Sequence, residues 1–280
     1  MHVSPHSRWL RWPAAVAALV LMLLLGPLSV MAFGDIDLQT PWHQTRTDST
    51  SQAPDPALVH DAVVQVFGAR TVRWRGAFAI HPWIAVKRAG ADHYTTYQVI
   101  GWRAYRGGNA LVASETRAPD SRWFGAEPQL LAERRGPGVD ALIDRIEAAV
   151  HRYPWGQDYK LWPGPNSNTF VAHVARQVPE LGLDLPPTAI GKDYLGPTTF
   201  IAPAPSGTGW QASAWGLAAV TVAREEGFEL NLMGLSFGVD INDARLRLPG
   251  LGHWPGTAPG HPAAGSRPLG PVRPAQAGSR

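Results

Sequence analysis

The sequence predicts an α+β domain in which an antiparallel sheet packs on helices. The segments 62–67, 72–87, 95–103 and 110–114 are rich in β-branched and aromatic residues, which is typical of strands. The apolar residues of segment 139–150 recur every three or four positions instead, which is typical of an amphipathic helix. This change of period marks the passage from sheet to helices.

Turn and stop residues separate the expected elements. The strand at 72–87 is interrupted around Gly76 and at His81-Pro82, and Pro154 ends the first helix. A second helix begins near Asn166, and its apolar stripe runs to Val178. Further along, segments 220–223 and 228–233 predict a hairpin around an acidic turn with Gly227.

Composition divides the chain into four parts. Residues 1–33 form an apolar signal anchor or signal peptide, and polar residues 34–57 are expected to be a flexible tether. Residues 58–250 form a single α+β domain with a C-terminal hairpin. The Pro, Gly and Ala-rich residues 251–280 are expected to be a disordered tail.

The N-terminal segment predicts a contact with the cytoplasmic (inner) membrane. Arg8 and Arg11 precede the apolar run, and Asp35 and Asp37 follow it, which favours an N-inside orientation. Two interpretations stay open, an uncleaved anchor and a signal peptide cut after Ala32. Both place the bulk of the chain in the periplasm or otherwise outside the cytoplasm.

Composition also excludes several kinds of chemistry. The chain has no cysteine, which rules out disulfides, thiolate zinc sites and a thiol nucleophile. The ten histidines show no metal-ligand spacing, and no phosphate loop or dinucleotide fingerprint is present, so we expect no metal and no cofactor. The net charge is only +3 and the arginines are scattered, so nucleic acid is not an expected partner.

Two polar residues are candidates for catalysis. Ser167 follows a Pro-Gly-Pro turn at the start of the second helix, where free backbone N–H groups and the helix dipole favour a developing negative charge. His81 lies within an apolar strand and is the candidate base, with Tyr97 or Gln98 on the next strand to orient its ring. The alternatives are a simple helix N-cap and a buried structural histidine.

Several segments resemble a bacterial family known only as domain of unknown function 3750. The resemblance lies in the segments 81–87, 97–102, 162–170, 229–232 and 237–240. The family name implies no activity.

A more distant resemblance does imply an activity. The chain is similar to permuted papain-like proteins, including NlpC-like proteins and lecithin:retinol acyltransferase, which have a histidine on an early strand and a later Asn-Cys-Gln-x-Phe-like motif at a helix start. His81 is similar to that histidine, and segment 166–170 is similar to that motif with Ser167 at the cysteine position. The resemblance implies a papain-like fold with Ser167 as nucleophile and His81 as base, and either Gln98 or Tyr97 is expected to orient that base. Residues expected to bind substrate or form the oxyanion hole are Asn166, Asn168, Tyr97 and Trp162.

A rival serine motif and three functions remain. Gly234-Leu235-Ser236-Phe237-Gly238 matches the elbow of α/β-hydrolases, but no helix pattern follows it, so we interpret it as a turn. The first function is amide or ester hydrolysis or acyl transfer by a Ser/His pair. The alternatives are an inactive papain-like module that binds cell-wall peptide or lipid, and a structural envelope protein.

Overall fold

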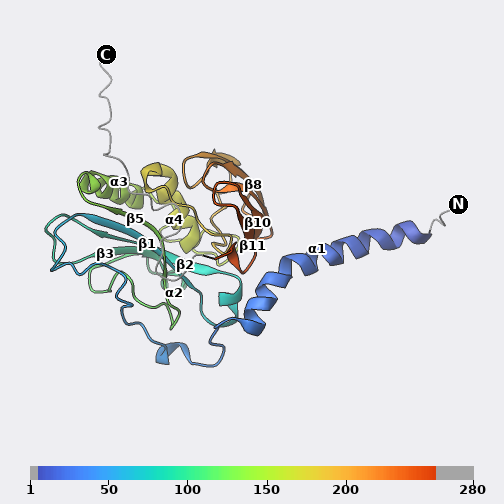
Figure 1. Ribbon diagram of the computed structural model, residues 1–280, viewed down its shortest axis with the longest axis horizontal. Helices are drawn as coiled ribbons and strands as arrows, with labels where there is room; N and C mark the ends of the chain where they lie inside the picture. Colours follow the sequence, from blue (N-terminus) through green and yellow to red (C-terminus); the bar gives the residue numbers. More distant parts are fainter. Residues whose placement is uncertain (1–5, 257–280) are drawn as a thin grey trace, which may run out of the picture.

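The structure is a computed structural model that describes residues 6–256 of the chain (Figure 1). Two antiparallel sheets of five and seven strands are combined with helices, which confirms the predicted α+β class. A long helix, α1 (His6–Phe33), projects away from this body.

The first sheet has five strands in the order β4-β3-β2-β1-β5. All its strand pairs are antiparallel, and β1 pairs with β2 in an unbroken register from Val63↔Lys87 to Arg70↔Ile80. The strands are β1 (Val63–Arg70), β2 (Ile80–Lys87), β3 (Thr95–Val99), β4 (Leu111–Ser114) and β5 (Gln129–Arg135).

Helices α3 (Val139–His151) and α4 (Ser167–Gln177) cover one face of this sheet. Their apolar stripes, with Leu142, Ile143, Phe170 and Val174, form one buried core with Ile84 and other side chains of that face. Both helices therefore lie where the 3.6-residue pattern places them. The opposite face carries a smaller aromatic cluster, described below.

Three local predictions were wrong. The strand expected to reach residue 103 ends at Val99, because the short helix α2 (Gly101–Tyr105) begins there. Gly101 lies against the ring of Tyr159, where a Cβ would come within 2.4 Å. The strand expected from residue 72 begins only at Ile80, after the 3₁₀ turn η2 (Arg73–Ala77), which contains the expected interruption at Gly76. The interruption expected at His81-Pro82 is absent, because β2 pairs with β1 through both residues.

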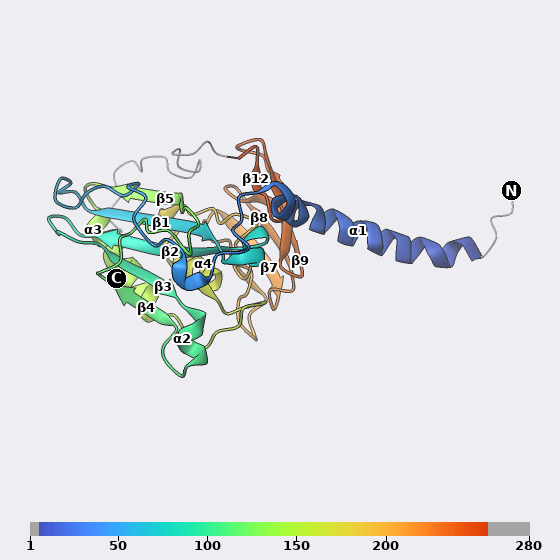
Figure 2. The same ribbon diagram turned by 90° about the horizontal axis from the view of Figure 1, so that it is seen from below.

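The second sheet contains far more than the expected hairpin. Seven strands follow one another in sequence order, and the predicted hairpin is the β8–β9 pair in the middle. Helix α4 lies between the two sheets (Figures 1 and 2). The strands are β6 (Ile201–Pro203), β7 (Gly209–Ala214), β8 (Ala218–Ala223), β9 (Gly227–Leu232), β10 (Leu235–Asp240), β11 (Arg245–Leu248) and β12 (Gly252–Trp254).

The segments on either side of the domain make contacts of their own. Within the segment 34–57, which contains the 3₁₀ turn η1 (Trp42–Gln44), the backbone N–H of Gln52 and the hydroxyl of Ser49 donate to Asp120 at 2.6 and 2.7 Å. This part of the expected tether is therefore bonded to the domain. Of the predicted disordered tail 251–280, residues Gly252–Trp254 form strand β12, and residues 257–280 lie outside the described residues.

The buried stripe of α3 leads to a prediction for stability. Leu142 is 2% exposed, whereas Leu58 is 78% exposed, so the same substitution can be compared at both positions. We expect Leu142→Ala to lower the free energy of unfolding by about 2–5 kcal/mol, and Leu58→Ala to change it by less than about 0.5 kcal/mol. Urea unfolding of the detergent-solubilised full chain measures both values. Equal losses would contradict the placement of α3 in the core.

Candidate functional site

The start of α4 is held by a complete N-terminal cap. The side chain of Asn166 accepts hydrogen bonds from the backbone N–H groups of Asn168 and Thr169 at 2.9 and 3.2 Å. In return, the Asn166 N–H donates to the Thr169 hydroxyl at 3.1 Å, which completes a capping box. The cap therefore uses two of the first N–H groups of the helix, those of Asn168 and Thr169.

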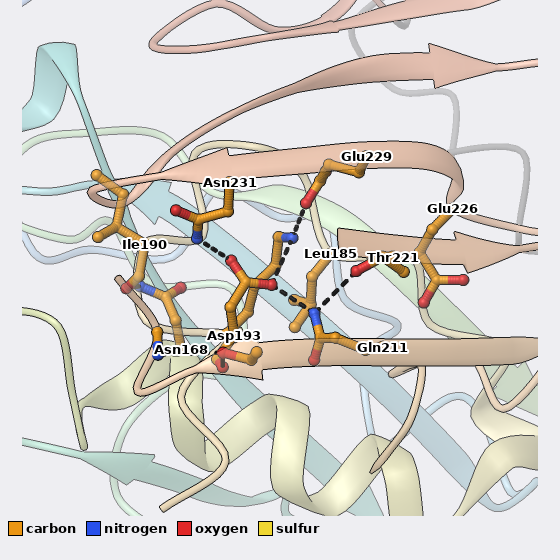
Figure 3. Close-up of polar contacts among 12 residues, drawn as sticks. Asn168, Leu185, Ile190, Asp193, Gln211, Thr221, Glu226, Glu229 and Asn231 are labelled. Carbon is orange, nitrogen blue, oxygen red and sulfur yellow. Dashed lines mark hydrogen bonds and ion pairs between the residues drawn. The ribbon is translucent and has the colours of Figure 1, made fainter. Parts of the chain in front are cut away.

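Asn168 ties this helix start to the first sheet. Its amide nitrogen donates to Ile80 O at 3.1 Å and to Ile190 O at 2.8 Å. Figure 3 shows Asn168 beside Ile190, at one end of a polar cluster. Because Ile80 precedes His81 and Asn168 follows Ser167, the backbones of the two candidate catalytic residues are held close together.

His81 is hydrogen-bonded to Gln98, one of its two expected partners. Its Nε2 lies 3.1 Å from Gln98 Oε1, and since that oxygen only accepts, the ring carries its proton on Nε2. Trp123 stacks on the imidazole with a centroid distance of 3.6 Å, and Arg117 lies over the Trp123 ring. Burial, with Arg117 nearby, lowers the pKa of His81 to about 3.

The side chain of His81 lies on the face of the sheet opposite α4. Alternation along β2 places Ile80 and Ile84 in the core with Phe170 of α4. His81 and Trp83 point the other way, where Trp83 is buried in the aromatic cluster with Trp123. The sheet therefore separates the imidazole from the body of the helix that begins with Ser167.

Ser167 is the first residue of α4 and is almost fully buried. Within residues 6–256, no side chain or backbone group is hydrogen-bonded to its hydroxyl. The structure thus brings His81 and Gln98 together and gives Ser167 the expected place at a helix start. Among the described residues, the Ser167 hydroxyl makes no hydrogen bond to the His81 imidazole.

The other expected site residues lie elsewhere. Tyr97 alternates with Gln98 and faces the helix layer, where its hydroxyl donates to Glu147 of α3 at 3.1 Å. Trp162 donates through Nε1 to Met233 O at 3.1 Å, on the turn between β9 and β10. Only one of the two candidate orienting residues therefore shares the face of His81, as strand alternation requires.

A second polar cluster, which the sequence did not predict, lies between α4 and the seven-stranded sheet (Figure 3). Arg247 is fully buried and donates to Glu229 and to Asp184, both at 2.7 Å. Glu229 also pairs with Lys192. Asp193 accepts from Gln211 and Asn231 and contacts Lys192; the cluster comprises Asp184, Lys192, Asp193, Gln211, Glu229, Asn231 and Arg247.

Within this cluster, the pairing of opposite charges shifts the pKa values more than burial does. Burial alone would raise the pKa of Glu229 and of Asp184, but the neighbouring cations hold both pKa values below their usual range. Burial would lower the pKa of Lys192, and Asp193 and Glu229 raise it instead. These groups therefore stay charged and paired, which is typical of a structural network.

A local sequence signal for this cluster does exist. Polar residues alternate with apolar ones along β7, β8 and β9, as in Gln211, Thr221 and Glu229. The alternation does not tell which set faces the interior, and the usual expectation is that the apolar set does. Among the described residues, no group of His, Asp and Glu side chains is arranged to hold a metal ion.

The comparison with family models connects the first of these sites to a known family. Residues 61–194 match the model described as "Protein of unknown function (DUF3750)", which supports the family resemblance found in the sequence. His81, Gln98 and Ser167 all lie in the matched segment, whereas β6–β12 follow it. The search of curated proteins and the search of solved structures found no match.

Glu226, beside the cluster, leads to a prediction about pH. Burial, with Asp184 as the second cause, raises the pKa of Glu226 from 4.5 to about 7, and its carboxyl accepts from Ser206 N at 2.8 Å. A raised carboxyl pKa means that the folded chain binds the proton more tightly than the unfolded chain. Stability from this proton is therefore present at low pH and is lost as the pH rises from about 4.5 to about 7.

We expect Glu226→Gln, which resembles the protonated carboxyl, to remove this loss. At pH 8 the variant should be more stable than the wild-type chain by about 3 kcal/mol, and near pH 4 the two should be similar. Urea unfolding between pH 4 and pH 8 measures the difference. Glu127→Gln is the control, since its carboxylate is exposed and should leave the pH profile unchanged. Parallel profiles for wild type and Glu226→Gln would contradict the prediction.

Proposed function

We propose that the chain is a membrane-tethered envelope protein whose papain-like domain binds cell-wall peptide or lipid without cleaving it. The observation that carries the non-catalytic part is the placement of the His81 imidazole on the face of the five-stranded sheet opposite α4. A general base has to reach the proton that it removes, directly or through one water.

The electrostatics of His81 support the same proposal. A serine hydroxyl needs a base whose pKa lies near the working pH, and the pKa of His81 is lowered to about 3. The imidazole is instead held by Gln98 on one side and Trp123 on its face, as a buried structural histidine would be. The N-terminal cap of α4 also occupies the N–H groups of Asn168 and Thr169.

Helix α1 supports the membrane tether. Its segment Trp12–Phe33 is long and apolar enough to cross a membrane. Arg8 and Arg11 before this segment and Asp35 and Asp37 after it support a domain outside the cytoplasm, according to the positive-inside rule.

A hydrolase or acyltransferase is the second candidate function. The observation that favours it is the 3.1 Å contact between His81 Nε2 and Gln98 Oε1, because it leaves Nδ1 as the basic nitrogen of an oriented ring. The hydroxyl of Ser167 at the start of α4 is the only nucleophile that the resemblance assigns.

Labelling with a fluorophosphonate distinguishes the two candidates. We expect the full chain to show no labelling that depends on Ser167, because the hydroxyl lacks an activating base. Ser167→Ala is compared with Ser236→Ala, a serine of the buried face of β10. Labelling that is lost in Ser167→Ala and kept in Ser236→Ala would overturn the non-catalytic proposal and establish the enzyme.

The tether is tested with a single cysteine. The chain has none, and Ala89 lies exposed on the turn between β2 and β3, so Ala89→Cys provides one reactive site. We expect the chain to stay in the membrane fraction at alkaline pH and Cys-directed, membrane-impermeant maleimide to label it in intact bacterial spheroplasts. Labelling only after lysis would contradict the proposed orientation, and release of the chain into the soluble fraction would contradict the anchor.

A further inference from the structure

The seven-stranded sheet is polar inside and apolar outside. Residues paired directly across its strands form an outer row that runs over six strands and carries only apolar side chains, each at least 41% exposed. We define this outer row by its paired members Trp210, Val222, Phe228, Val239, Leu246 and Trp254.

The adjacent row points inward and has the opposite character. It contains Glu229 and Arg247 of the buried ionic cluster together with other polar residues. Its paired members are Gln211, Thr221, Glu229, Gly238, Arg247 and His253. An antiparallel sheet with one face in water has the reverse arrangement, so the outer face of this sheet is built for an apolar environment.

The apolar surface extends beyond the outer row. A shallow groove of about 510 Å³ crosses β6 to β9 on the same face, and its walls are almost entirely apolar. Phe200, Ile201, Val220 and Leu230 are among its lining residues. Large exposed apolar surfaces of this kind mark contacts with a partner or a membrane.

Helix α1 meets the domain at the edge of this same sheet. Gly26 lies so close to the loop between β11 and β12 that a Cβ would come within 2.0 Å of Pro249 O. Gly250 in turn lies against Pro27, and Leu23 and Val30 of α1 are buried. The glycines allow the backbones of helix and loop to touch.

The side on which α1 leaves the domain fits a membrane contact. In both views α1 projects outward on the side of the seven-stranded sheet, whose outer face points away from α4 (Figures 1 and 2). The candidate span of 22 residues is about 33 Å long, close to the thickness of a hydrocarbon core. Residues 23–30 belong to the second half of this span and contact the domain, so the β11–β12 loop lies beside the end of the span that leads into the domain.

We propose that the outer face of the seven-stranded sheet rests on the lipid bilayer that α1 crosses. Trp210 and Trp254, at the two ends of the outer row, lie at the headgroup level, where tryptophan is enriched. This inference rests on the proposed membrane tether. The domain is then held at two places, by α1 and by the sheet, and its orientation on the membrane is fixed.

Single-cysteine variants of the full chain test the proposal. Val222→Cys and Val239→Cys place an environment-sensitive fluorophore (NBD) on the outer row, and Ala89→Cys places it on the opposite sheet as the control. The labelled chains are reconstituted in vesicles of phosphatidylglycerol and phosphatidylethanolamine, with and without brominated acyl chains. We expect blue-shifted emission and quenching by brominated lipid at positions 222 and 239, and neither effect at position 89.

Three outcomes are informative. Equal responses at all three positions, in a chain that stays with the vesicles, would overturn the membrane-resting face while leaving the tether intact. Loss of the chain from the vesicles would contradict the tether itself. Blue-shifted emission that brominated lipid does not quench, together with self-quenching between labels, would show that a second copy covers the face and would also overturn the proposal.

Discussion

The arrangement of the two sheets depends on the ion pairs and hydrogen bonds of the buried Arg247 guanidinium. It joins β11 to Glu229 on β9 and to Asp184 and Leu185 O in the segment that follows α4. Removing a charged pair from water is costly, and only complete pairing makes it tolerable. The ion pairs of Arg247 connect the seven-stranded sheet to the segment that follows α4, so they favour the observed position of the sheet.

The segment that follows α4 also contacts the candidate site. Ile190 O accepts from Asn166 and Asn168, and Gly191 O accepts from the Thr169 hydroxyl at 2.7 Å. Lys192 and Asp193 follow at once and belong to the ionic cluster. The start of α4, with Ser167, is therefore held between two sheets by consecutive residues of one loop, which explains how so many polar side chains can be buried there.

The sequence predicts those parts of the fold in which the apolar side chains are the buried ones. The stripe of α3 and α4 belongs to the core, and strand alternation correctly leaves only one of Tyr97 and Gln98 beside His81. The sequence does not predict the seven-stranded sheet, because polar side chains are the buried ones there. Its polar set, including Glu229, faces inward, so the pattern resembles solvent-exposed strands and loops, and only the tertiary pairing with Lys192 and Arg247 makes it a core.

The candidate site combines a local motif with a side-chain direction that the motif does not determine. The Asn166–Phe170 motif and the His81 strand lie next to each other, and the hydrogen bond from Asn168 to Ile80 O connects them. What the motif does not encode is the direction of the His81 side chain, which alternation along β2 sends to the aromatic cluster.

The direction of the His81 side chain is the main support for the proposed function. In the aromatic cluster, the His81 ring contributes stacking with Trp123 and a hydrogen bond to Gln98, and its low pKa keeps it neutral. A neutral, stacked imidazole suits a dry interior, whereas a general base must alternate between charged and uncharged forms. The features that make His81 a good part of the core are therefore the same features that make it a poor partner for a serine, and this is the physical ground for proposing binding over cleavage.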